Sequence, residues 1–252
     1  MSFQNQSFVI FGATGGIGAA LAHQLAREGC RLTLAARDQS RLDSLTGKLN
    51  VEGCSCEATN SEAVDRCLLE ASERYGRLDG VVNCVGSLFL KPAHATGDQD
   101  WLNVLATNLT SAFYILRSSA RLMMRSGGGS IVLMASAVAQ RGMINHDAIA
   151  AAKAGVVGLA LSAAATYARY NIRVNCVAPG LTRTPLTASL TQNELTLKAS
   201  AALHPLGRIG EPDEVASAIR WFLSPEQAWV TGQVLAVDGG LSSLQSRMAS
   251  NP

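Results

Sequence analysis

The sequence contains few charged and few aromatic residues. Only 16% of its 252 residues are charged and 5% are aromatic, whereas 48% are hydrophobic. At this length such a composition is typical of one large globular domain and excludes a disordered chain. Because the formal net charge is only +2 and no run of lysines and arginines is present, we expect no binding to nucleic acid or membrane.

Long hydrophobic stretches and targeting signals are also missing. No stretch of about 18 residues is uniformly apolar, and residues 1–6 lack the basic and apolar regions of a signal peptide. The six cysteines are scattered; only Cys54 and Cys56 are close together, and no histidine stands near them at zinc-binding spacing. We therefore predict a cytoplasmic protein without a metal site, whose cysteines are mostly small core residues.

A glycine-rich turn near the N-terminus is the most informative local pattern. The apolar run Phe8 to Phe11 predicts a buried strand, and an apolar helix pattern opens at Ala19 and runs to about Glu28. Between them lie the residues that we expect to cradle a dinucleotide, namely Gly12, Thr14, Gly15, Gly16, Ile17 and Gly18. Glycine lets the backbone approach a pyrophosphate, and the following helix N-terminus offers free N–H groups.

Strand and helix patterns then alternate along the whole chain. We predict strands at 31–36, 52–58, 78–84, 130–135, 172–177 and 233–237, and helices at 39–49, 62–75, 101–125, 147–170 and 212–223. This alternation predicts an α/β fold, a parallel sheet of about seven strands with helices on both faces, in a single domain over 1–252. Residues 182–206 interrupt the pattern where a lid over a substrate pocket would lie, and the tail 242–252 is polar.

The motifs, taken together, resemble the short-chain dehydrogenases/reductases from about Ser7 to Gly240. They are Gly12-Ala-Thr-Gly-Gly-Ile-Gly18, Asn83-Cys-Val-Gly86, Asn108, Ser136, Lys153, Ile172-Arg-Val-Asn-Cys-Val-Ala-Pro-Gly180, Gly207-Arg-Ile-Gly-Glu-Pro-Asp-Glu-Val215 and Val237-Asp-Gly-Gly240. The resemblance implies a doubly wound Rossmann fold, a nicotinamide dinucleotide, hydride transfer to or from a small molecule, and a homo-oligomer, usually a tetramer, with a dimer as the alternative.

The end of the second strand bears on which nicotinamide cofactor binds. In such folds an acidic residue there holds the ribose 2′-hydroxyl and selects NAD. Ala36 stands at this place, and Arg37 follows, whose guanidinium suits a 2′-phosphate. We therefore expect NADP(H) rather than NAD(H), with the alternatives that Arg37 is merely solvated and that Asp38 turns inward to favour NAD.

The resemblance assigns further residues to the cofactor. It places Glu57, with Ala58, near the adenine. It implies that Asn83, Val85 and Gly86 support the ribose, and that Pro179, Gly180, Thr182 and Thr184 face the nicotinamide carboxamide. The alternative for Glu57 is a surface charge at the end of a strand.

The expected catalytic set is incomplete. Family members usually carry Tyr-x-x-x-Lys, with a serine thirteen positions before the tyrosine and an asparagine upstream. In the family the lysine lowers the pKa of the tyrosine and holds the nicotinamide ribose, the serine polarises the carbonyl, and the asparagine supports a water chain to the lysine. The alternative for the serine is that it only caps the turn after its strand. Ser136, Lys153 and Asn108 fit these places, but counting from Ser136 and from Lys153 leads to Ile149. An isoleucine donates no proton, so the usual mechanism requires a change in its acid.

His146 is the candidate replacement. It lies seven residues before Lys153, so both side chains would share a helix face if the helix reached back that far. Imidazole is a competent acid near neutral pH. The spacing also resembles that of enoyl-thioester reductases, a divergent branch whose proton donor stands at the earlier position. The alternative is a loop residue pairing with Asp147, which is itself a weaker candidate.

These observations leave three hypotheses open. The first is an NADP(H)-dependent oxidoreductase with altered acid chemistry, acting on a carbonyl compound or a conjugated enone. The second is a catalytically silent cofactor-binding protein, and the third is an isomerase or cyclase that uses the cofactor structurally.

Overall fold

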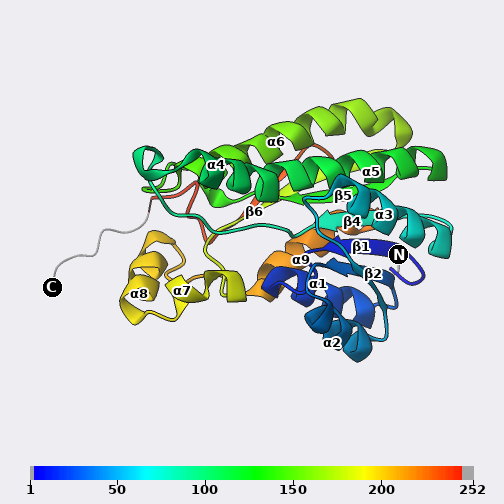
Figure 1. Ribbon diagram of the computed structural model, residues 1–252, viewed down its shortest axis with the longest axis horizontal. Helices are drawn as coiled ribbons and strands as arrows, with labels where there is room; N and C mark the ends of the chain where they lie inside the picture. Colours follow the sequence, from blue (N-terminus) through cyan, green and yellow to red (C-terminus); the bar gives the residue numbers. More distant parts are fainter. Residues whose placement is uncertain (1–2, 246–252) are drawn as a thin grey trace.

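A computed structural model of the chain describes residues 3–245 and contains a seven-stranded parallel sheet covered by helices (Figure 1). The strands are β1 (Ser7–Phe11), β2 (Arg31–Ala36), β3 (Glu52–Ser55), β4 (Gly80–Asn83), β5 (Gly129–Met134), β6 (Ile172–Pro179) and β7 (Val234–Val237). The α-helices are α1 (Gly16–Arg27), α2 (Gln39–Leu49), α3 (Ser61–Tyr75), α4 (Asp98–Leu105), α5 (Ser111–Ser126), α6 (Asp147–Tyr167), α7 (Ala188–Thr191), α8 (Glu194–Leu203) and α9 (Pro212–Leu223). The predicted Rossmann fold is confirmed.

Strand β1 shows why the sheet is buried on both faces. Phe8 and Ile10 point into the apolar core beneath α1 and α9, whereas Val9 and Phe11 point into the core beneath α3, α5 and α6. Successive side chains on a strand face opposite sides of the sheet. A strand whose two faces are both covered by helices therefore has a continuous run of apolar residues. Figure 1 shows the two helical layers on either side of the sheet.

The strand order β3-β2-β1-β4-β5-β6-β7 reverses direction between β1 and β4. In open α/β sheets, ligands bind in the crevice at the carboxyl ends of the strands on either side of such a reversal. The glycine turn after β1 and the segment after β4 both lie at this place, so the topology alone positions the candidate cofactor residues together.

Several predicted elements differ in their bounds. The strands expected at 52–58 and 78–84 are shorter, at Glu52–Ser55 and Gly80–Asn83, and the strand expected at 172–177 extends to Pro179. The helix expected at 101–125 is interrupted by a π-helical turn, Ala106–Thr110, between α4 and α5. The first helix begins at Gly16 rather than at Ala19, because the glycines themselves form its first turn. Residues 182–206 contain α7 and α8, which stand apart from the sheet at its carboxyl edge (Figure 1). Part of the polar tail, 246–252, lies outside the described residues.

Helix α6, together with the 3₁₀ turn that follows it, is long and apolar enough to span a membrane. It is the only such helix within residues 3–245. Val156, Ala160, Ala163 and Ala164 of this helix lie in the apolar core against the sheet. Its apolar composition is thus explained by packing as a core helix.

Candidate active site

A cavity of about 340 Å³ opens at the carboxyl edge of the sheet. Its walls come from the segments after β4, β5 and β6, from α6, and from the lid segment 182–206. The lining residues are Ile17, 84–88, Leu90, 134–138, Met143, His146, Ile149, Lys153, 179–181, Leu186, Thr187, Leu190, Ser200, Leu203, His204 and Leu241. Most are apolar, so the cavity suits a largely apolar ligand with a few polar anchor points.

The glycine turn fits a dinucleotide. Gly12 has φ +71°, and a Cβ there would come within 2.8 Å of the Cys84 carbonyl carbon, so only glycine is tolerated. Any Cβ on Gly18 would collide with the Gly12 carbonyl oxygen. Helix α1 begins at Gly16, and no side chain caps its N-terminus, so its first N–H groups have no side-chain acceptor. These groups face the strand ends, where they are available to phosphate oxygens.

Gly16 also contacts the segment after β6. A Cβ on Gly16 would lie 2.8 Å from Cγ2 of Thr184 and 3.3 Å from Cδ of Pro185. The glycine turn and the segment 179–184 are therefore in contact. The sequence analysis had assigned these two segments to opposite ends of one cofactor.

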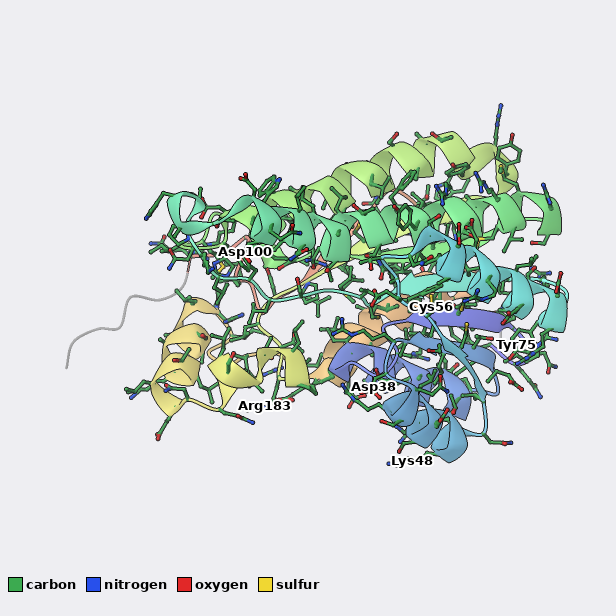
Figure 2. All side chains as sticks on the ribbon, in the orientation of Figure 1. Asp38, Lys48, Cys56, Tyr75, Asp100 and Arg183 are labelled. Carbon is green, nitrogen blue, oxygen red and sulfur yellow. The ribbon has the colours of Figure 1, made fainter. Side chains whose placement is uncertain are left out.

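The end of β2 and the start of α2 form the region where the sequence analysis expects the choice between NADP and NAD. Asp38 caps α2, because its Oδ1 accepts from the Arg41 N–H at 3.0 Å and from the Ser40 hydroxyl at 2.9 Å (Figure 2 labels Asp38). These hydrogen bonds lower the pKa of Asp38. Arg37 is exposed and makes no hydrogen bond or ion pair within the described residues.

Arg41 adds a second cation that the sequence reading missed. Its guanidinium donates to the Thr14 carbonyl at 2.6 Å, which anchors α2 to the glycine turn. No motif indicated Arg41, because its partner Thr14 lies in another segment of the sequence. Arg37 and Arg41 thus bring two positive charges near the glycine turn.

The other predicted adenine and ribose residues are placed as follows. Glu57 is exposed, and its Oε1 accepts from the Thr59 N–H and hydroxyl, while Ala58 is buried. Asn83 is buried, and its Oδ1 accepts from the Val85 N–H at 2.9 Å, which shapes the turn after β4. Glu57 is therefore engaged in a local turn.

Lys153 lies on α6 at the floor of the cavity. Its Nζ donates to the Met134 carbonyl at 2.9 Å, and the residue is only 6% exposed. Burial lowers the pKa of Lys153 to about 8, although the neighbouring Cys176 and Cys84 act in the opposite direction. A lysine with such a pKa holds or releases a proton near neutral pH.

Ser136 follows β5 and also lines the cavity. Its Oγ accepts a long hydrogen bond, 3.4 Å, from the Val138 N–H, so the turn-capping alternative is realised. The hydroxyl proton of Ser136 has no acceptor within residues 3–245, so it remains available to a ligand oxygen.

Asn108 stands in the π-helical turn and is buried. Its Oδ1 accepts from the Ser87 N–H at 3.1 Å, and its Nδ2 donates to the Ser87 hydroxyl at 2.8 Å and to the Val104 carbonyl at 3.0 Å. A Cβ on Gly86 would lie 3.2 Å from Asn108 Oδ1 and 3.5 Å from Lys153 Nζ, so Gly86 separates the two side chains. Asn108 holds the 86–88 loop, and its predicted water chain to Lys153 stays a prediction.

Position 149 is apolar and buried. Ile149 is 5% exposed, lines the cavity, and belongs to an apolar cluster with Val104, Ala148 and Ala152. No polar atom stands at this position next to Ser136 and Lys153.

His146 lies just outside α6, as its N-cap residue, because the helix begins at Asp147. The expected helical continuity to Lys153 thus stops one residue short. The side chain lines the same cavity nevertheless. Its Nδ1 is 2.7 Å from the Ile144 carbonyl, which accepts, so Nδ1 carries the hydrogen and Nε2 has no partner in the described chain.

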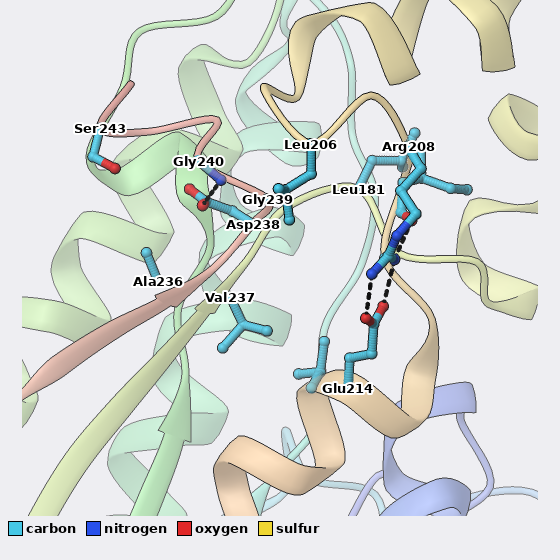
Figure 3. Close-up of a pocket in the computed structure, with 13 residues that line it drawn as sticks. Leu181, Leu206, Arg208, Glu214, Ala236, Val237, Asp238, Gly239, Gly240 and Ser243 are labelled. Carbon is cyan, nitrogen blue, oxygen red and sulfur yellow. Dashed lines mark hydrogen bonds and ion pairs between the residues drawn. The ribbon is translucent and has the colours of Figure 1, made fainter. Parts of the chain in front are cut away.

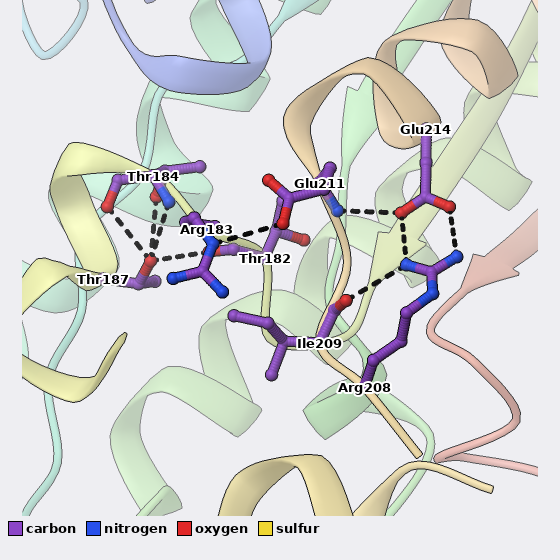
Figure 4. A network of polar contacts seen from close by, with 8 residues as sticks. All are labelled: Thr182, Arg183, Thr184, Thr187, Arg208, Ile209, Glu211 and Glu214. Carbon is purple, nitrogen blue, oxygen red and sulfur yellow. Dashed lines mark hydrogen bonds and ion pairs between the residues drawn. The ribbon is translucent and has the colours of Figure 1, made fainter. Parts of the chain in front are cut away.

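Two arginines at the lid segment, Arg183 within it and Arg208 just after it, are tied to carboxylates (Figure 4), whereas Lys198 of the lid is exposed and has no ion pair within the described residues. Arg183 pairs with Glu211 at 3.2 Å, and Arg208 contacts Glu214 through two hydrogen bonds of 2.8 and 2.6 Å. Arg208 is the largest cause that lowers the pKa of Glu214 to about 2. Nearby, Thr187 donates to the Thr182 carbonyl at 2.6 Å and contacts the Thr184 hydroxyl at 3.1 Å. Both arginine charges are therefore already balanced by carboxylates.

A second hollow of about 320 Å³ lies between the end of β7 and the start of α9 (Figure 3). Its charged groups are already engaged: Arg208 pairs with Glu214, and Asp238 accepts from the Gly240 and Ser242 N–H groups. It contains none of the predicted catalytic residues. Three of them, Ser136, His146 and Lys153, line the larger cavity, whereas Asn108 lines neither.

Comparisons with known proteins agree with this geometry. The family model described as "Enoyl-(Acyl carrier protein) reductase" matches residues 12–242. The 3-oxoacyl-(acyl-carrier-protein) reductase FabG of Vibrio cholerae is 34% identical over 96% of this chain and 99% of its own length. Carbonyl reductase family member 4 of Danio rerio is 38% identical over 94% of this chain and 98% of its own.

Solved structures are similar over nearly the whole chain. A short-chain type dehydrogenase/reductase from Mycobacterium ulcerans has a TM-score of 0.94 at 30% identity, covering 98% of this chain and 93% of that one. A variant of actinorhodin polyketide ketoreductase with NADPH has a TM-score of 0.90 at 31% identity, covering 97% and 100%. The cavity, the glycine turn and these relatives together show that the chain belongs to the short-chain dehydrogenase/reductase family.

Proposed function

We propose that this protein is an NADP(H)-dependent reductase of a small, mostly apolar carbonyl compound or conjugated enone, with Ile149 in place of the usual tyrosine. The observation that carries the proposal is the single cavity lined by Ser136, His146 and Lys153 beside the glycine turn. By family membership we also expect a homo-oligomer in the cytoplasm.

The proposed chemistry divides the work among these side chains. A bound reduced nicotinamide supplies a hydride. The Ser136 hydroxyl donates a hydrogen bond to the substrate oxygen, on which negative charge develops. His146, as an imidazolium, gives a proton from Nε2 to that oxygen of a ketone, or to the α-carbon of an enone, and is left neutral. Lys153 holds positive charge beneath the site, and Asn108 keeps the 86–88 loop in place.

The preference for NADP(H) is supported by the engagement of Asp38 in capping and by the exposed cations Arg37 and Arg41. Arg37→Ala should therefore weaken NADPH binding by about tenfold or more, because a charge-assisted contact to phosphate contributes roughly 1.5–3 kcal/mol. NADH binding should change little. Titration of both nucleotides by fluorescence measures the effect.

Arg27→Ala is the matched control, since Arg27 is an exposed arginine at the far end of α1. An equal loss of NADPH and NADH affinity in Arg37→Ala would contradict the phosphate assignment.

Oxidation of NADPH in the presence of ketones, quinones and enones tests turnover. We expect consumption with at least one apolar, uncharged class, because most residues that line the cavity are apolar. His146→Ala should lower kcat by about 100-fold, within the range for a general acid, while NADPH affinity is retained. His94→Ala, an exposed histidine remote from the cavity lining, should leave kcat unchanged.

The packing of Ile149 favours a second candidate. Since Ile149 joins an apolar cluster with Val104 and Ala152, the position is built as core, as it would be in a silent cofactor-binding protein. Tight NADPH binding without consumption of any substrate in the panel would support this candidate over the reductase.

A further inference from the structure

His204 is a buried histidine outside the set of residues given a role above. It follows the last turn of α8 and is only 3% exposed. Its Nδ1 lies 2.7 Å from the Ser200 carbonyl. A carbonyl only accepts, so Nδ1 carries the hydrogen, and in the neutral ring Nε2 presents a lone pair.

That lone pair has no protein partner. Nε2 of His204 is buried and makes no hydrogen bond within the described part of the chain. Leaving a buried acceptor unpaired costs stability, and native proteins rarely do so unless water, an ion or a ligand completes the bond.

The ring stands at the wall of the candidate active site. His204 lines the same cavity as Ser136, and a Cβ on Gly180 would come 2.8 Å from His204 Nε2. Glycine at 180 therefore leaves room for the ring at the end of β6. Asp238 also lies beside Gly180, but its carboxylate only accepts, here from the N–H groups of Gly240 and Ser242, so it does not pair with the lone pair of Nε2.

We propose that His204 is a substrate-recognition residue whose Nε2 accepts a hydrogen bond from an O–H or N–H group of the substrate. This rests on the proposed function. The cavity walls near it are apolar, with Leu186, Leu190 and Leu203. The substrate is then an apolar carbonyl compound that carries a hydroxyl or amide N–H at the end remote from its reacting carbon. A site built to pair with such a donor discriminates against analogues that lack it.

Matched probe pairs test the donor requirement. The probes are 4-(4-hydroxyphenyl)butan-2-one and its 4-methoxy analogue, together with the corresponding 3-substituted pair. Calorimetric titration into NADP⁺-loaded protein should give about tenfold tighter binding for the hydroxyl member of at least one pair. A long-range ¹H–¹⁵N spectrum should show the His204 Nε2 resonance moving with that probe only.

Two variants separate recognition from structure. His204→Asn places an amide N–H where Nδ1 bonds to the Ser200 carbonyl, and it removes Nε2, so its fold should persist and its preference for hydroxyl probes should vanish. His204→Gln restores a polar atom near the place of Nε2 and should recover part of that preference. A merely structural histidine would change the stability of both variants without changing the ratio of the two affinities.

Several results would overturn the assignment. These are equal binding of every probe pair by the wild type, no binding of any hydroxyl probe, or an unchanged preference in His204→Asn. A loss of NADP⁺ affinity in His204→Asn would also overturn it, because the ring would then serve the cofactor. Failure of the wild type to bind NADP⁺ at all refutes the proposed function itself, and the nucleotide titration is done first to distinguish the two.

Discussion

Ile149→Tyr will reduce simple ketones with NADPH at least about 100-fold faster than the wild-type chain. General acids contribute roughly 10²–10⁴-fold to such steps, and the substitution places a phenol beside Ser136 and Lys153. The side chain of residue 149 already lines the cavity of about 340 Å³, so the larger ring has space to extend into it. Initial rates of NADPH oxidation with a series of uncharged ketones measure the gain.

Ile149→Phe is the matched control for this gain. It adds the same ring without the hydroxyl, so it should bind NADPH and leave ketone reduction at the wild-type level. If the tyrosine and phenylalanine variants both fold and bind NADPH but reduce ketones at equal rates, then the remaining site does not support the usual chemistry. That result would favour the second candidate, a protein that binds the cofactor without catalysing a reaction.

The second large effect concerns Lys153. Its pKa is lowered from 10.5 to about 8 by burial, so between these values the folded protein holds fewer protons than the unfolded chain. The free energy of unfolding of the cofactor-free protein should therefore rise with pH from about 8 to 10.5. Below pH 8 the full cost of burying the ammonium is present, on the order of 3 kcal/mol.

Lys153→Met should remove this slope. It should also stabilise the cofactor-free protein at pH 7 by about 1–2 kcal/mol, because the relieved charge outweighs the lost hydrogen bond to the Met134 carbonyl. NADPH affinity should fall by about tenfold or more, since the family resemblance assigns the nicotinamide ribose to this ammonium. Urea unfolding from pH 7 to 10.5 and NADPH titration measure both effects.

Lys48→Met provides the comparison, because Lys48 is exposed on α2. It should leave both the pH profile and the NADPH affinity as in the wild type. A Lys153→Met variant whose unfolding free energy keeps the wild-type rise above pH 8 would show that the rise comes from another group.

Much of the fold was predictable because local patterns and topology agree. Three elements begin and end where their periodicity and flanking residues indicated. They are the helices Gln39–Leu49 and Pro212–Leu223 and the strand Arg31–Ala36. The π-helical turn around Asn108 was not predictable. A single wider turn changes the apolar periodicity of a helix too little to be detected in the sequence. The start of α6 at Asp147 likewise depends on how the preceding loop packs.

The candidate site divides in the same way. The sequence pointed to Gly12 through the glycine-rich turn, and to Ser136, Lys153 and the isoleucine at position 149 through the family resemblance. The sequence analysis did not identify Arg41 or His204 as site residues, because neither belongs to a motif. Each lies near the site through a neighbour distant in the sequence, Thr14 for Arg41 and Gly180 for His204.

The sequence by itself indicated the family, the alternation of strands and helices, and an isoleucine at the position where the family resemblance expects tyrosine, because these depend on residue identity and on spacing along the chain. Only the tertiary structure decided which polar atoms remain unpaired. It engages Asp38 as a helix cap, pairs the lid arginines with carboxylates, buries the Lys153 ammonium, and leaves Nε2 of His204 without a partner. Burial and hydrogen bonding depend on contacts between segments far apart in the chain, and a linear pattern does not encode these contacts directly.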